Sequence, residues 1–124
     1  MKYIITLFTI LQITSVQAEI ITMEVTSSAY NSVPSQTTAK NPALTAWGDT
    51  LTSGMKAIAV SRDLIKLGLT HNVKVKIIGL EGEYLVLDKM NKRWSKKVDI
   101  YMGLDVQAAK NWGKRTVTIS WEKK

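Results

Sequence analysis

The sequence predicts a mainly β protein, built as a closed barrel of six short strands with one or two short helices. Short apolar or alternating runs recur along the chain, and turn-forming residues separate them. The chain has no cysteine, so packing alone must hold the domain together, as it does in a closed β architecture. The short strands and small helical inserts favour a barrel over a sandwich of long hairpins.

Residues 20–78 supply three strands, a long loop and a short helix. Residues 20–26 are rich in β-branched side chains and predict a strand, whereas 27–42 are rich in Ser, Thr, Asn and Pro and predict an irregular loop. The fully apolar run 57–60 is typical of a buried strand. A cap residue, apolar spacing and a terminal glycine predict a helix within 61–68. Residues 73–78 alternate valine with lysine, which indicates a strand with one solvated face.

The second half supplies the remaining strands and a second helix. Residues 79–82 form the glycine-containing loop of a hairpin that leads into a strand at 83–87. Apolar runs predict further strands at 98–102 and 116–121. Between these two, a helix is expected at 106–112, with an aspartate before it and a glycine after it.

The first 18 residues have the features of an export signal. Lys2 gives a positive start, a mostly apolar stretch follows, and small residues precede an expected cleavage after Ala18. The apolar stretch is interrupted by polar residues and is shorter than the roughly 20 residues that a membrane anchor needs. We therefore expect no membrane anchor, a periplasmic or extracellular location, and a single mature domain over 19–124.

Composition narrows the possible partners and chemistry. The formal net charge is +7, which favours anionic partners such as wall polymers, lipid head groups or extracellular nucleic acid. Without cysteine, thiol chemistry and cysteine metal sites are excluded. His71 is the single histidine and is expected to be a solvated loop residue. The sequence implies no metal and no organic cofactor.

Two aspartates are the strongest functional signal. Asp88 and Asp99 lie eleven residues apart, each in or at the end of an apolar run, and five cations and Trp94 lie between them. Apolar strands rarely contain aspartate without a reason, because a buried carboxylate must be paired or neutralised. Alternation places Asp99 and Tyr101 on one face of their strand. We therefore expect the two carboxylates to converge on one site.

These residues also resemble a known family. The stretches that carry the resemblance are Tyr30, Thr45-Ala46-Trp47-Gly48, Ala57-Ile58-Ala59-Val60, Val86-Leu87-Asp88, Val98-Asp99-Ile100-Tyr101 and Trp112-Gly113. Their order and spacing resemble the 3D domain, which is named for three aspartates. That domain is the double-psi β-barrel of membrane-bound lytic transglycosylase A and of small secreted muralytic proteins. The similarity covers about residues 25–121.

The resemblance implies an activity on peptidoglycan glycan strands. Family members cleave the MurNAc–GlcNAc bond without water and leave a 1,6-anhydro sugar, and Asp99 matches their single catalytic acid and base. Ordinary glycosidases need two carboxylates, but the second is dispensable when the sugar's own C6 hydroxyl is the nucleophile. A raised pKa suits such an acid, and Asp88 would supply a neighbouring like charge.

The chain also departs from the family pattern. A bulky cationic segment, 90–96, replaces the glycine-rich segment that precedes the last aspartate. The family's first aspartate aligns with Ser61, and Asp63 is a shifted candidate. Because nearby cations lower the pKa of a carboxyl group, this segment opposes the role of a proton donor.

Other side chains are candidates for substrate contact. The residues expected to line a glycan groove are Trp94, Tyr30, Thr45, Gly48, Gln36 and Thr37. Each has a structural alternative: Trp94 can pin its loop to the barrel, Tyr30 and the nearby polar residues can cap their own loop, and the cationic run can be a solvated face. Asp88 can likewise cap the turn that follows it.

We therefore expect a lytic transglycosylase-like enzyme. The alternative is a non-catalytic glycan-binding module on the same barrel. A third possibility is a binder of nucleic acid or anionic surfaces through 89–97. Nucleic acid is not expected, because such surfaces interleave exposed aromatic residues with the charges and only Trp94 is suitable.

Overall fold

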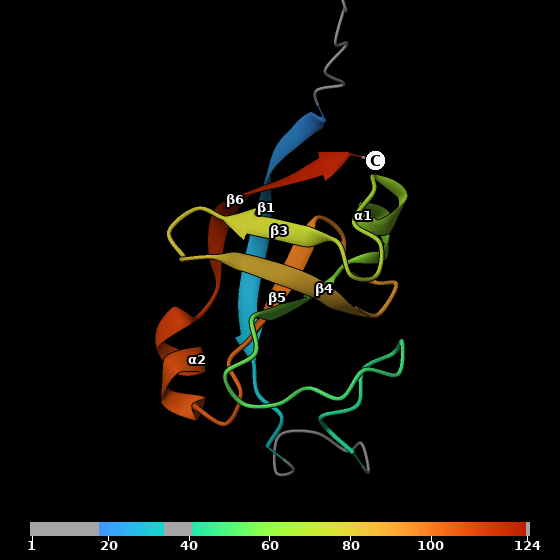
Figure 1. Cartoon of the computed structure of the whole chain (residues 1–124). Coiled ribbons are helices and arrows are strands. Elements are labelled where there is room, and N and C mark those ends of the chain that lie inside the picture. Colours follow the sequence, from blue (N-terminus) through green and yellow to red (C-terminus); the bar gives the residue numbers. More distant parts are fainter. Residues whose placement is uncertain (1–17, 34–40, 124) are drawn as a thin grey trace, which may run out of the picture.

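The computed structural model describes residues 18–33 and 41–123, and within these ranges the chain forms a closed barrel of six strands with two short helices (Figure 1). The strands close in the order β1-β5-β2-β4-β3-β6. Their bounds are β1 Glu19–Tyr30, β2 Ala57–Val60, β3 Lys74–Ile77, β4 Glu83–Lys89, β5 Lys97–Tyr101 and β6 Arg115–Lys123, and the helices are α1 Arg62–Lys66 and α2 Val106–Trp112.

Parallel and antiparallel pairs alternate along the strands β1, β5, β2 and β4. β5 is parallel to β1 and antiparallel to β2, and β2 is parallel to β4. The remaining pairs, β1 with β6, β3 with β4 and β3 with β6, are antiparallel. Because the sheet closes on itself, these strands leave no free edge to pair with another chain.

The main core fills the barrel interior. From β2, Ile58 and Val60 point inward, and from β5, Val98 and Ile100 do so; all four are at most 1% exposed. β2 is buried on its outer face as well, where a second apolar cluster consists of Leu51, Ala57, Leu87 and Tyr101. Leu51 belongs to the loop 41–56, which runs below the strands in Figure 1. This loop therefore covers part of the outer surface of the barrel.

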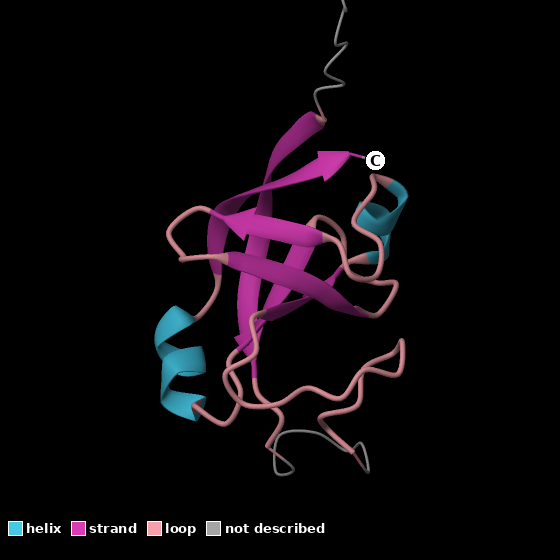
Figure 2. Cartoon of the chain, in the orientation of Figure 1, coloured by secondary structure: helices cyan, strands magenta, loops and turns pink. Residues whose placement is uncertain are grey.

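The two helices lie at opposite ends of the barrel in Figure 2. Asp105 caps α2 by accepting a hydrogen bond from the backbone N–H of Ala108, and Gly113 ends the helix with a φ of 63°. Trp112 joins α2 to β1, because its indole N–H donates to the Ser27 hydroxyl at 3.1 Å. The expected helix 106–112 is therefore confirmed, whereas α1 is shorter than the predicted 61–68.

The mainly β barrel and its six strands were predicted, but the bounds of several strands were not. The strand at 57–60 is confirmed, while β1 extends through residues 27–30, which were expected in a loop. These residues lack strong strand propensity, and they are held by parallel pairing with β5, from Ser27 opposite Val98 to Tyr30 opposite Tyr101. β4 likewise includes Asp88, which was expected just after the strand.

The expected export signal falls almost wholly within residues 1–17, outside the described residues, and β1 begins at Glu19. Within the described ranges, neither helix has the length and apolar character needed to cross a bilayer.

Candidate active site on the outer face of the barrel

Four side chains form a row across four neighbouring strands, and we call it the carboxylate row. Asp99 of β5 lies opposite Ser28 of β1 on one side and opposite Ala59 of β2 on the other. Ala59 in turn lies opposite Asp88 of β4, beside a register shift in the ladder. Directly opposed residues point to the same side of a sheet, and the neighbours of Asp99 along β5 face the core. The row therefore lies on the outer face of the barrel.

Asp99 is a partly buried carboxyl group with a raised pKa. Burial is the main cause, and the negative charge of Asp88 adds to it. A hydrogen bond from the Ser28 hydroxyl to Asp99 Oδ1, at 3.2 Å, and the charge of Lys97 act in the opposite direction but do not cancel the effect of burial. The protonated form of Asp99 therefore persists to higher pH than that of a solvated aspartate.

Asp88 connects the carboxylate row to the loop 41–56. Its Oδ1 accepts hydrogen bonds from the backbone N–H groups of Ala46 and Lys89, both at 2.9 Å. The expected capping role is thus present, but one of the capped groups lies 42 residues away in sequence. Asp88 therefore fixes the loop over the sheet and also places a second carboxylate near Asp99.

Tyr30 ends β1 beside the two carboxylates. Its ring packs against Tyr101 with centroids 5.4 Å apart. Its hydroxyl is buried and has no hydrogen-bond partner among the described residues. Burial raises the pKa of Tyr30 far above its usual range, with further contributions from Asp88, Asp99 and Tyr101. Tyr30 is therefore a neutral, buried hydroxyl whose hydrogen-bonding capacity is not used by the described residues.

Thr45 and Gly48, which were expected in a groove wall, shape the turn next to Asp88. Thr45 is 6% exposed, and its hydroxyl accepts a hydrogen bond from the backbone N–H of Asp49 at 3.0 Å. Gly48 has a φ of 88°, a conformation that favours glycine, and its N–H donates to the Thr45 carbonyl. Both residues thus hold the turn that offers the Ala46 N–H to Asp88.

A histidine–aspartate pair supports the same turn and was not predicted. His71 Nε2 and Asp49 Oδ2 are 2.6 Å apart, and the His71 ring lies 5.1 Å from the Trp47 ring. His71 was expected to be a solvated loop residue, and it is indeed exposed in a turn, but it is paired there with Asp49. Among the described residues, no three histidine or acidic side chains lie close enough to share a metal ion.

Trp94 contacts Lys97, which lies two residues before Asp99 on β5. Lys97 Nζ is 3.7 Å from the Trp94 ring centroid, and the Arg93 guanidinium carbon is 4.9 Å from it. The Lys97 ammonium therefore covers one face of Trp94, and contact of this residue with a sugar stays a prediction. Lys97 was expected in a solvated charge run, but it is only 9% exposed, and its ammonium lies against the face of Trp94.

The two candidates for the family's first aspartate hold the backbone near Lys97. Ser61 is fully buried, and its hydroxyl accepts a hydrogen bond from the Lys97 N–H at 3.0 Å. Asp63 accepts one from the Lys96 N–H at 2.9 Å. Burial opposes ionisation of Asp63, but hydrogen bonds from Ser61, the Lys96 backbone and Ser95 hold its pKa below the usual value. Neither residue is in the carboxylate row.

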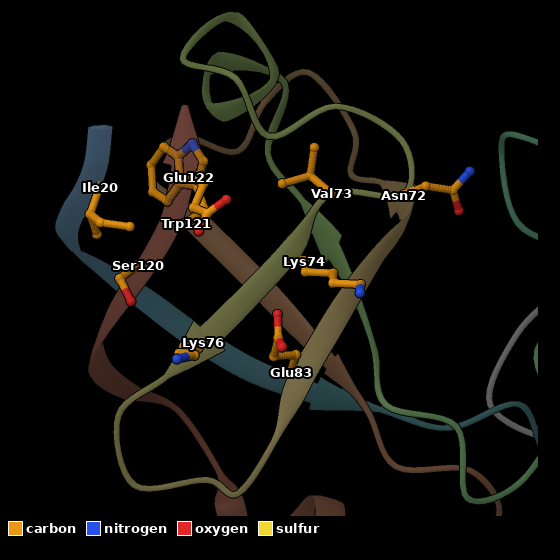
Figure 3. Close-up of a pocket in the computed structure, with 9 residues that line it drawn as sticks. All are labelled: Ile20, Asn72, Val73, Lys74, Lys76, Glu83, Ser120, Trp121 and Glu122. Atoms are coloured by element: carbon orange, nitrogen blue, oxygen red, sulfur yellow. The ribbon is translucent and has the colours of Figure 1, made fainter. Parts of the chain in front are cut away.

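Two cavities lie near the barrel surface, and neither has Asp88 or Asp99 in its lining. A cavity of about 320 Å³ lies between the end of β1 and α2 and includes Tyr30. A larger one, of about 670 Å³, lies over β3, β4 and β6, where Lys74, Lys76 and Glu83 line it (Figure 3). Gln36 and Thr37, also predicted to contact substrate, lie outside the described residues.

Comparisons with known proteins do not identify the chain. No protein-family model matches it, and no curated protein matches it either. A functional assignment therefore depends on the site itself.

Proposed function

We propose that the protein is a lytic transglycosylase-like enzyme that cleaves the MurNAc–GlcNAc bond of peptidoglycan, on a barrel of the double-psi type found in the 3D family. The observation that carries the proposal is the raised pKa of Asp99 on the outer face of β5, in one row with Asp88. A carboxyl group that remains protonated at higher pH than usual is suited to donate a proton to a leaving oxygen.

In the proposed mechanism, one carboxyl group acts twice. The protonated Asp99 donates its proton to the glycosidic oxygen as the bond to the anomeric carbon breaks and positive charge develops on the sugar. The C6 hydroxyl of the same sugar then attacks the anomeric carbon and passes its proton to the Asp99 carboxylate. This sequence forms the 1,6-anhydro product and restores the acid, with no water and no cofactor consumed.

The neighbours of Asp99 support the two halves of this cycle. Asp88 raises the pKa of Asp99 and so favours the acid form, whereas Ser28 and Lys97 stabilise the carboxylate form that accepts the second proton. In this proposal the Tyr30 hydroxyl, which has no hydrogen-bond partner among the described residues, donates to a sugar oxygen. The proposal also includes export of the protein to the compartment that holds its polymeric substrate.

A second candidate function is a non-catalytic glycan-binding module. It is favoured by the cavities, because neither of the two described above is lined by Asp99, and by the bulky cationic segment 90–96. In that case the barrel and its loop would bind a glycan strand without cleaving it.

Incubation of the purified protein with sacculi, followed by mass spectrometry of released muropeptides, distinguishes these functions. The enzyme predicts 1,6-anhydro products that disappear in Asp99→Asn and persist in Glu83→Gln, a change on a remote exposed carboxylate. The binding module predicts co-sedimentation with sacculi that Asp99→Asn leaves unchanged, and no released product. Release of products with a reducing end would contradict the proposed mechanism.

A further inference from the structure

Lys97 is an unusual lysine because, within the part of the chain that the structure describes, its ammonium has neither a carboxylate nor a hydrogen-bond partner. It is 9% exposed, and among the described residues it forms no ion pair with a carboxylate and its ammonium donates no hydrogen bond. The ammonium instead lies over the face of Trp94, with Nζ 3.7 Å from the ring centroid. Lysines this deeply buried are almost always paired, and an ammonium has three donors to satisfy.

The backbone at Lys97 is fixed by its neighbours. Ser61 makes two hydrogen bonds with it: the Ser61 N–H donates to the Lys97 carbonyl at 2.8 Å, and the Lys97 N–H donates to the Ser61 hydroxyl at 3.0 Å. Asp63 holds the preceding residue, Lys96, in a left-handed conformation with a φ of 46°. From the other side, the Thr26 N–H of β1 donates to the Lys96 carbonyl at 3.0 Å. The position of this lysine is therefore set by the fold.

Lys97 also lies beside the proposed catalytic acid. It is two residues before Asp99 on β5, so the two side chains share the outer face of the strand, about 7 Å apart along it. The pKa of Asp99 responds to the Lys97 charge, yet the two groups are not close enough to form an ion pair. A ligand over Asp99 would therefore have this ammonium within reach.

We propose that Lys97 is a specificity-determining residue that binds an anionic substituent, a carboxylate or a phosphate, on the glycan that lies over Asp99. This inference rests on the proposed function for the location of the glycan. It adds that the substrate is an acidic glycan and that neutral chitin-type strands are bound more weakly. Trp94 holds the ammonium by a cation–π contact, which leaves its hydrogen-bond donors to the ligand.

Binding measurements in the Asp99→Asn background, where turnover is absent, test this inference. The probes are neutral chitotetraose, a tetrasaccharide of the same length whose muramic units carry free lactyl carboxylates, and a phosphorylated chitotetraose. We expect the background protein to prefer an acidic probe, and Lys97→Met to weaken binding of that probe about tenfold while leaving chitotetraose unchanged. Lys97→Arg retains the preference. Which acidic probe is preferred identifies the source of the anion.

Lys92→Met is the matched control, because Lys92 belongs to the same cationic segment but is exposed. It should retain the preference. A preference that survives Lys97→Met, or equal binding of neutral and acidic probes before that change, overturns the inference. Titration of the background protein with the acidic probe, followed through the Lys97 side-chain NMR resonances, avoids any folding defect of the variants; unmoved resonances also overturn it.

The inference and the proposed function can fail separately. Absence of anhydro products together with a preference that depends on Lys97 contradicts the enzyme and leaves the lysine as the anion-recognising group of a binding module. Anhydro products together with a preference that ignores Lys97 leave the enzyme and remove the inference.

Discussion

Asp88 and Asp99 lie opposite the same residue, Ala59 of β2, from its two sides. The two carboxylates are therefore separated by one methyl side chain on a single face of the barrel. Ala59 is 6% exposed, and a larger residue there would stand between the two acids. This arrangement explains how Asp88 influences the pKa of Asp99 even though β4 and β5 are not hydrogen-bonded to each other.

The raised pKa of Asp99 predicts a stability change with a defined dependence on pH. The folded protein binds the Asp99 proton more tightly than the unfolded chain does, so this carboxyl group lowers the stability of the fold as pH rises above the ordinary value of 3.8. Asp99→Asn should therefore raise Tm at pH 7, and the gain should shrink as pH falls to about 3. Thermal melts between pH 3 and 7 measure this.

Asp105→Asn is the control for that experiment. Asp105 is exposed at the N-cap of α2, and asparagine caps a helix about as well as aspartate. Asp105→Asn should give no comparable rise in Tm at pH 7. If the difference in Tm between Asp99→Asn and the parent protein does not change with pH, the pKa of Asp99 is not raised in the folded protein.

Removal of Asp88 should loosen the loop 41–56. Asp88→Ala deletes the acceptor for the N–H groups of Ala46 and Lys89 and should cost about 1–2 kcal/mol of unfolding free energy. Hydrogen exchange at the Ala46 amide should accelerate. Asp88→Asn retains an oxygen acceptor and should restore most of the stability, while the pKa of Asp99 falls because the like charge is gone. Unchanged exchange at Ala46 in Asp88→Ala would show that another contact holds the loop.

Tyr30→Phe should separate stability from ligand binding. The Tyr30 hydroxyl is buried without a partner among the described residues, so its removal should leave the free energy of unfolding unchanged or raise it by about 1 kcal/mol at most. Glycan affinity should fall if the hydroxyl donates to a sugar. Tyr101→Phe provides the contrast, because its hydroxyl is 2.7 Å from the Ser32 hydroxyl and its loss should be destabilising. A clear drop in Tm for Tyr30→Phe would indicate that the hydroxyl has a partner in the free protein.

Much of the fold was predictable because its signals are local. Alternation along 98–102 placed Asp99 on the face opposite the core, and the core residues Val98 and Ile100 confirm it. The shared site of Asp88 and Asp99 was expected from their spacing, but its cause is β2, which lies between their strands and comes about 30 residues earlier in the chain. The strand itself was predicted at 57–60, but no local pattern reveals that it lies between the other two.

The features that were not predicted from the sequence depend on contacts between residues distant in sequence, or on residues in surroundings unusual for their type. Lysine in a cationic run is typical of a solvated surface, and only the position of Trp94 shows that Lys97 is covered. The pairing of His71 with Asp49 spans 22 residues between two loops. The extension of β1 through polar residues follows from its partner β5 and not from strand propensity.

The pair formed by Asp49 and His71 predicts a coupled effect on the turn that serves Asp88. Asp49→Ala removes the contact with His71 at 2.6 Å and also the acceptor for the Thr45 hydroxyl, at 3.4 Å, whereas His71→Ala removes only the first. Asp49→Ala should therefore be the more destabilising change. In a double-mutant cycle measured by urea unfolding, the coupling energy should be about 0.5–1 kcal/mol, because both side chains are only partly buried.

Since Ala46 lies in this turn and donates to Asp88, Asp49→Ala should also accelerate exchange of the Ala46 amide. If the losses of unfolding free energy in the two single variants are additive, and the exchange rate of the Ala46 amide is unaltered, the pair is a surface contact with no influence on the carboxylate row.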